Sequence, residues 1–156
     1  MSAFSTFLKR HCLYLAWFVS LVAVAGSLYL SEVLKYEPCK LCWFQRIFMY
    51  PQVFLLGIAT YRNDKRIIPY VLPLCVVGGS ISLYHYAEQK IPALGTVVPC
   101  TIGVPCTKDY LNFFGFITIP LLALTAFVLI FVLLWNGRAR EEEISEETGD
   151  GFTQVE

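Results

Sequence analysis

The chain has 156 residues, of which 56% are hydrophobic and only 15% are charged. Its 12 basic and 12 acidic residues give a net charge of zero. The sequence has no basic patch of the kind that binds nucleic acid. A soluble domain of this length does not need so apolar a composition, and the apolar residues form four blocks of bilayer-spanning length. The sequence therefore predicts an all-α membrane protein, a four-helix transmembrane bundle.

The first apolar block covers residues 12–30 and carries no charge. A signal peptide is an alternative interpretation, because Ala23-Val24-Ala25 before Gly26 resembles a cleavage site. The apolar run continues past that point to Leu30, and its full length is typical of a span. We therefore expect the first block to cross the membrane.

Three further spans are predicted, at residues 43–60, 67–86 and 116–135. The block at 67–86 is the least hydrophobic, and its small residues would allow neighbouring helices to approach closely. We expect residues 1–137 to form one transmembrane domain. The segment 138–156 turns strongly acidic, and we expect a disordered cytoplasmic tail there.

Basic residues flank the predicted spans mainly on one side of the membrane. The cytoplasmic ends of spans carry the excess of lysine and arginine. On this side lie Lys9, Arg10, Arg62, Lys65, Arg66, Arg138 and Arg140. We therefore expect a multi-pass protein of the cell membrane, with both termini in the cytoplasm and the two cysteine-containing loops outside.

Each outer loop contains a close pair of cysteines, Cys39 with Cys42 and Cys100 with Cys106. Thiols outside the cytoplasm form disulfides, and the plain alternative is that both pairs are structural staples. Chain entropy gives about 2 kcal/mol for the first bridge and about 2.4 kcal/mol for the second, whereas a bridge between the loops would give about 4.3 kcal/mol. Short pairs suit thiol–disulfide exchange instead, because the second thiol must reach a mixed disulfide. We therefore expect all four cysteines to be catalytic, in a two-pair redox relay.

Other uses of these cysteines are weaker. A zinc site with four cysteine ligands conflicts with an oxidising compartment and with the loose C-x5-C spacing, so we expect no metal. A thioredoxin fold is excluded because no βαβ pattern surrounds the C-x-x-C motif. The remaining Cys12 and Cys75 lie inside spans, where we expect them to pack as small hydrophobic residues.

The C-x-x-C motif lies at the outer start of the second span. Because a helix N-terminus favours an anion, we expect Cys42 to have the lowered pKa, and Cys39, in the loop after Pro38, to be the more accessible thiol. Arg46 follows Cys42 by one helical turn. It could stabilise negative charge on a reduced quinone or on the thiolate, or it could reach lipid headgroups.

Electrons that leave the dithiol need an acceptor. The sequence contains nothing that resembles a haem, flavin or iron–sulfur motif, so a membrane quinone is the simplest choice. His85, between two tyrosines near the outer end of the third span, is either a packing residue or a second quinone contact.

Over nearly its whole length the chain resembles the DsbB/BdbC family of disulfide bond formation proteins. The resemblance is carried by the run Cys39–Arg46 (CKLCWFQR), by Tyr84-His85-Tyr86 and by Phe114-Gly115-Phe116 before the last span. It implies a thiol:quinone oxidoreductase with Arg46 at the quinone. It also implies that a thioredoxin-like oxidase of the DsbA type delivers electrons to Cys100 and Cys106, from which they pass to Cys39 and Cys42. A relay of this kind, from DsbA through DsbB to quinone, is known to keep the bacterial periplasm oxidising.

One feature departs from the long-loop members of Gram-negative bacteria. The second pair here is C-x5-C, as in the short-loop BdbC type of Gram-positive bacteria, so a BdbD-type oxidase is an equally good partner and menaquinone is as good a candidate as ubiquinone. Two rival functions remain at this stage. One is a non-catalytic assembly or receptor subunit with stapled loops, and the other is a reductase resembling the vitamin K epoxide reductase group, whose C-x-x-C opens a later helix.

Overall fold

The computed structural model describes residues 11–91 and 118–150, the segment 139–150 as backbone only. Its elements are α2 (Cys12–Leu28), a π-helical turn η1 (Tyr29–Val33), α3 (Lys40–Arg62), a 3-10 turn η2 (Lys65–Ile67), α4 (Ile68–Lys90) and α5 (Ile119–Asp150). Across these two described ranges there is no strand.

The four predicted spans are confirmed. Four helical segments are long and apolar enough to cross a membrane: Cys12–Val33, Lys40–Arg62, Lys65–Lys90 and Ile119–Arg138. Three of them are longer than the apolar blocks predicted, because a helix continues through the polar residues that flank a block as long as its backbone hydrogen bonds persist. The orientation in the membrane stays a prediction.

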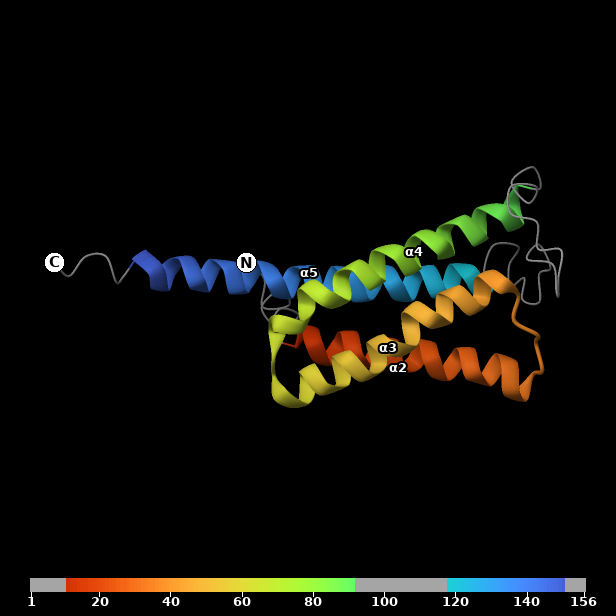
Figure 1. Ribbon diagram of the computed structural model, residues 1–156, viewed down its shortest axis with the longest axis horizontal. Coiled ribbons are helices and arrows are strands. Elements are labelled where there is room, and N and C mark those ends of the chain that lie inside the picture. The colour runs from red at the N-terminus through yellow and green to blue at the C-terminus, as the bar shows by residue number, and fades with distance from the viewer. Residues whose placement is uncertain (1–10, 92–117, 151–156) are drawn as a thin grey trace.

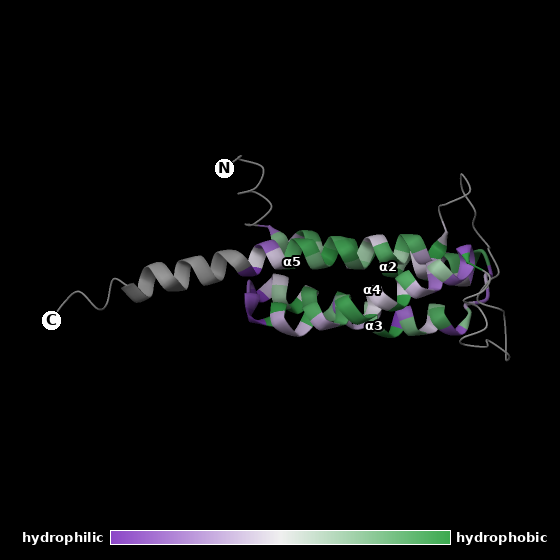
Figure 2. Cartoon of the chain, turned by 90° about the horizontal axis from the view of Figure 1, so that it is seen from above, coloured by the Kyte–Doolittle hydropathy of each residue, from purple (hydrophilic) through white to green (hydrophobic). Residues whose placement is uncertain are grey.

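The helices pack in the cyclic order α2, α3, α4, α5, and successive helices run in opposite directions (Figure 1). Consequently the start of α2 lies at the same end of the bundle as the α3–α4 turn, and the start of α3 lies at the other end (Figure 1). Apolar residues cover the middle of the bundle and hydrophilic residues gather toward its two ends (Figure 2). This distribution matches a hydrocarbon layer between two polar interfaces.

The outer surface of the bundle carries many large apolar side chains. Large hydrophobic side chains such as Phe54, Tyr70 and Val76 are exposed on the helix surfaces. A helix that is hydrophobic on every face would expose apolar surface to water unless it were buried. In a membrane the outward-facing apolar side chains contact lipid instead, so protein does not need to cover them. This is why the apolar blocks are continuous instead of following a helical period.

Local signals fix the ends of α3 and the short turn after it. Cys39 is the N-cap of α3 with an extended backbone, and Asn63 ends the helix in the left-handed region at φ 50°. The Asp64 side chain then accepts a hydrogen bond from the backbone N–H of Arg66 at 3.0 Å. The next helix begins with Pro69 in its first turn, where a missing N–H costs nothing.

The two cysteines inside spans are buried, as expected. Cys12 packs in the core where α2 meets α5, and Cys75 lies 3.6 Å from the side-chain oxygen of Gln52. Gln52 is fully buried and also donates to the Phe48 carbonyl at 3.1 Å. The buried amide is therefore satisfied within the bundle, as a polar group in this environment requires.

The helix α5 continues beyond the bundle to Asp150 (Figure 1). It thus includes a large part of the segment 138–156 for which we expected disorder. The run contains alanine, arginine and glutamate, which have high helix propensity, so the helix can continue through these polar residues. Residues 151–156 lie outside the described part of the chain.

Gly78 on α4 allows close contact with α5. A Cβ atom at this position would overlap the ring of Phe127, which is buried with 1% of its surface exposed. The adjacent Gly79 differs, because a Cβ there would lie at an ordinary 3.6 Å from the Cβ of Phe127. The two glycines therefore form a matched pair for testing the α4–α5 interface.

We predict that Gly78→Ala destabilises the bundle by about 1–3 kcal/mol, since overpacking forces the helices apart. Gly79→Ala should be neutral or slightly stabilising, because alanine has the higher helix propensity. Thermal unfolding in detergent, followed by circular dichroism, measures both. Equal melting temperatures for the two variants would contradict the predicted overlap with Phe127.

Candidate functional site

The C-x-x-C motif forms a close dithiol at the first turn of α3. Its N-cap, Cys39, and the residue three positions later, Cys42, share one helical face, and their Sγ atoms lie 3.2 Å apart. Both are free thiols in the structure. Cys39 is buried, with 6% of its surface exposed, and Cys42 is half-buried. Our expectation that Cys39 is the more accessible thiol was therefore wrong.

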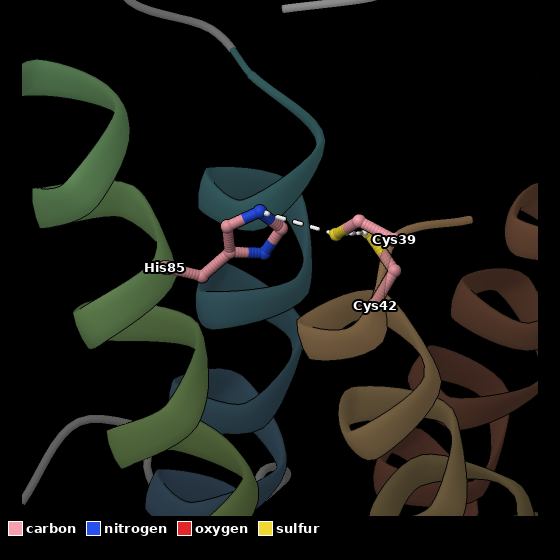
Figure 3. A group of neighbouring side chains, drawn as sticks. All are labelled: Cys39, Cys42 and His85. Atoms are coloured by element: carbon pink, nitrogen blue, oxygen red, sulfur yellow. Dashed lines mark hydrogen bonds between the residues drawn. The ribbon is translucent and has the colours of Figure 1, made fainter. Parts of the chain in front are cut away.

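A buried histidine from the neighbouring helix reaches this dithiol. His85 of α4 is 1% exposed, and its Nε2 lies 3.6 Å from the Sγ of Cys39 (Figure 3). Its other ring nitrogen, Nδ1, lies 3.1 Å from the side-chain nitrogen of Gln45, which is also buried. An amide N–H from Gln45 makes Nδ1 an acceptor, so Nε2 carries the hydrogen that faces the sulfur.

These neighbours make Cys39 the thiolate of the pair. The hydrogen bond with Cys42 is the largest cause that lowers the pKa of Cys39, to about 4, and the hydrogen bond from His85 acts in the same direction against the effect of burial. We had assigned the lowered pKa to Cys42, and this was wrong. The reason is positional: Cys39 is the sulfur that faces both the other thiol and the histidine.

Arg46 lies one turn below Cys42 and is tied to the first helix. Its Nε donates to the Ser27 hydroxyl at 3.0 Å, and an Nη2 hydrogen is donated to the Ser27 carbonyl at 3.2 Å. The guanidinium carbon also lies 5.6 Å from the ring centre of Trp43. The arginine is therefore held inside the bundle, which disfavours the alternative that it reaches lipid headgroups.

A cavity of about 500 Å³ connects the dithiol with Arg46 and His85. Both sulfurs line it, together with mostly apolar side chains of α2, α3 and α5. Its volume lies within the range of small-molecule sites, about 300–1,000 Å³. Part of the wall comes from Phe18 and Leu122, which are 53% and 51% exposed on the outer surface. The cavity is therefore bounded on this side by residues of the lipid-facing surface.

Among the described residues, two polar atoms in this cavity are buried without a hydrogen-bond partner. They are the hydroxyl of Tyr50 and the side-chain oxygen of Gln89. Buried polar groups normally have partners, and an orphaned one in a cavity indicates a place for a ligand.

The structure thus brings together Cys39, Cys42, Arg46 and His85. The other predicted pair, Cys100 and Cys106, lies outside the described residues. Sequence reasoning did not identify Gln45 or Ser27, which orient the histidine and the arginine. It also missed Glu88, one turn after His85, which is 2% exposed and whose Oε2 has no hydrogen-bond partner within residues 11–91 and 118–138. The only available signal was the polarity of these residues within or beside apolar blocks.

A close dithiol with one strongly acidic thiol, at the end of an apolar four-helix bundle, defines a membrane thiol-redox protein. Comparison with known proteins specifies the family. Residues 9–136 match the family described as "Disulfide bond formation protein DsbB". The chain belongs to this family of disulfide bond formation proteins.

Several curated relatives are similar over most of their length. "Disulfide bond formation protein C" of Bacillus subtilis is 55% identical over 122 residues, which cover 78% of this chain and 88% of the relative. "Probable disulfide formation protein C 1" of Bacillus cereus is 53% identical, covering 80% and 89%. "Probable disulfide formation protein" of Coxiella burnetii is 43% identical, covering 83% and 89%. No solved structure matches the chain.

We predict that His85→Ala raises the pKa of Cys39 by about one unit or more, because the variant lacks the hydrogen-bond donor that faces the thiolate. The measurement is the rate of alkylation at Cys39 as a function of pH, quantified by mass spectrometry. His11→Ala removes the other histidine of the chain and should leave the profile unchanged. Superimposable profiles for His85→Ala and wild type would show that the histidine does not stabilise the thiolate.

Proposed function

We propose that this protein is a thiol:quinone oxidoreductase of the cell membrane. It would reoxidise a thioredoxin-like oxidase of the DsbA or BdbD type and pass the electrons to a membrane quinone. In this way it would support disulfide bond formation in secreted proteins. Membership of the disulfide bond formation family supports the redox class, and the cavity beside the dithiol supports the choice of acceptor.

The observation that carries the proposal is that the dithiol and Arg46 line one largely apolar cavity. A quinone headgroup is a flat apolar ring with two carbonyl oxygens, and it supplies an acceptor for two electrons. The residues present suit such a ring. The Tyr50 hydroxyl and the guanidinium of Arg46 can donate hydrogen bonds to carbonyl oxygens, and the unpartnered oxygen of Gln89 can accept one from a hydroxyl. Menaquinone and ubiquinone share these features.

Each polar side chain then has a definite task. Cys39 is held as a thiolate, which is both the reactive form in exchange and a good leaving group. His85 keeps an N–H directed at that sulfur, and Gln45 fixes the ring from its other nitrogen. Arg46 provides a fixed positive charge where negative charge develops during electron transfer. Ser27 holds this charge in place.

The proposed path begins with the outer pair. A thiolate of the partner oxidase attacks the Cys100–Cys106 disulfide, and the resulting dithiol reduces a disulfide between Cys39 and Cys42. Oxidation of Cys39 and Cys42 back to a disulfide releases two electrons to the quinone. Every thiol exchange in this path is a swap of sulfur partners, so no other redox group is required.

The direct test uses purified protein in lipid vesicles with a quinone and a reduced thioredoxin-like oxidase. We expect the quinone absorbance to fall as the oxidase becomes oxidised, with one quinone consumed per disulfide formed. Absence of quinone reduction under these conditions would refute the proposal. A membrane-impermeant thiol reagent added to intact cells should label the cysteine loops from outside.

We predict that Cys39→Ser and Cys42→Ser each abolish quinone reduction, because neither single thiol can form the disulfide that delivers two electrons. Cys75→Ser is the matched control, since this cysteine is buried in another helix and contacts Gln52. It should keep near wild-type turnover. Full turnover in either of the first two variants would exclude the relay.

We predict that Arg46→Ala lowers kcat/KM for the quinone by about 10–100-fold, as expected when a charged hydrogen-bond donor of 1.5–3 kcal/mol is lost. Chemical oxidation of the dithiol should proceed as in wild type. Arg66→Ala, at the opposite end of the bundle, serves as control. If Arg46→Ala showed wild-type kinetics with the quinone, the arginine would have only a structural role.

A further inference from the structure

The dithiol and the histidine also form a set of metal-ligand atoms. The sulfurs of Cys39 and Cys42 and a ring nitrogen of His85 all lie within 4.8 Å of one another (Figure 3). The ligands come from the start of α3 and from α4, so the packing of two helices fixes their spacing. Two thiolates and one imidazole are a donor set that zinc prefers.

The observed distances are close to those that zinc requires. A tetrahedral ion with Zn–S of about 2.3 Å and Zn–N of about 2.0 Å places two sulfurs about 3.8 Å apart and a sulfur about 3.5 Å from the nitrogen. Here the two sulfurs are 3.2 Å apart, and the Cys39 sulfur is 3.6 Å from Nε2. The Cys42 sulfur lies within 4.8 Å of the ring nitrogen, so this third distance has to shorten by at most about 1.3 Å to admit the ion.

The neighbours of the site are compatible with a metal. Two thiolates balance the charge of Zn²⁺ next to Arg46, which lines the same cavity. A metal on Nε2 requires a hydrogen on Nδ1, and this hydrogen needs an acceptor. Gln45 can serve both forms of the site. In the metal-free thiol form its amide nitrogen donates to Nδ1. In the metal-bound form the amide group rotates, and its oxygen accepts the hydrogen on Nδ1.

A fourth ligand position is available from the cavity, which both sulfurs and the histidine line. Two cysteines, one histidine and an open position are also the ligand pattern of some catalytic zinc sites. Water or a small ligand in the cavity can complete the tetrahedron.

We propose that Cys39, Cys42 and His85 bind one Zn²⁺ ion in the dithiol form of the protein and release it when the dithiol is oxidised. The ion replaces the thiol protons of Cys39 and Cys42, and its binding transfers no electron. A disulfide removes two of the three ligands, so the metal and the disulfide exclude each other. Zinc would thereby act as a reversible inhibitor that holds the protein reduced. The binding step is independent of the proposed function, and only the inhibition depends on it.

The test uses full-length protein that carries Cys100→Ser and Cys106→Ser, so that the outer pair cannot contribute thiolates. Zn²⁺ is titrated against a chromophoric chelator with reduced and with oxidised protein. We expect one ion per reduced chain and at least a hundredfold weaker binding to the oxidised chain. Equal binding to both forms would overturn the proposal.

Variants identify the ligands. Cys39→Ser, Cys42→Ser and His85→Ala should each weaken binding at least tenfold, and Gln45→Leu should weaken it about tenfold through the orientation of the histidine. Cys75→Ser should bind as the parent does. Circular dichroism confirms that each variant is folded, and Co²⁺ adds a spectroscopic readout. Its absorption should show tetrahedral bands with thiolate charge transfer, and it should lose intensity in either dithiol variant. Unchanged spectra would place the ion elsewhere and refute the assignment.

Inhibition is measured separately. Zn²⁺ should slow quinone reduction by the wild-type dithiol, and a chelator should restore the rate. If Zn²⁺ binds as described but the protein reduces no quinone even after chelation, the proposed function fails and the metal site stands. If quinone reduction is normal and Zn²⁺ does not bind, the metal proposal alone fails.

Discussion

The contact between the Cys39 sulfur and the His85 ring is the interaction on which the site depends. An anionic sulfur in a largely apolar bundle is unfavourable unless hydrogen bonds compensate it. The histidine supplies such compensation only because α3 and α4 pack with these two residues at the same level. The amide of Gln45 prevents the ring from turning away. Stability of the helix pair and reactivity of the thiol are therefore set by the same packing.

The four helices contribute unequally to this arrangement. The helix α3 carries the dithiol, Gln45 and Arg46, and so it provides most of the chemistry from a single stretch of sequence. The other helices hold that stretch in position: α4 through His85, α2 through Ser27, and α5 through the apolar wall of the cavity. Close approach of α4 and α5 at Gly78 keeps that side of the bundle compact. A change far from the sulfurs can therefore alter their environment.

The sequence was sufficient for the helices and for part of the site. Long uncharged blocks identify spans reliably, because the bilayer fixes their length. The spacing from Cys42 to Arg46 places both on one helical face, so their meeting in one cavity was predictable.

The contact of Cys39 with His85 was not predictable, since it joins residues 46 positions apart and depends on how α4 is rotated against α3. For the same reason the wrong sulfur was chosen as the thiolate. Helix dipole arguments favour any thiol at the helix start, and only tertiary neighbours distinguish the two. The helical extension toward Asp150 was missed because acidic composition was given more weight than helix propensity.

The side of the cavity formed by Phe18 and Leu122 has a consequence for supply of the oxidant. These residues belong both to the cavity wall and to the surface that faces the hydrocarbon. The quinone that we propose as acceptor could thus arrive by lateral diffusion in the bilayer, with its isoprenoid tail among the lipid chains, without passing through water. The choice of oxidant would then depend on how compounds partition between water and the bilayer. Polar oxidants would be excluded because they dissolve poorly in the hydrocarbon layer. The turnover rate would follow the concentration of quinone within the membrane.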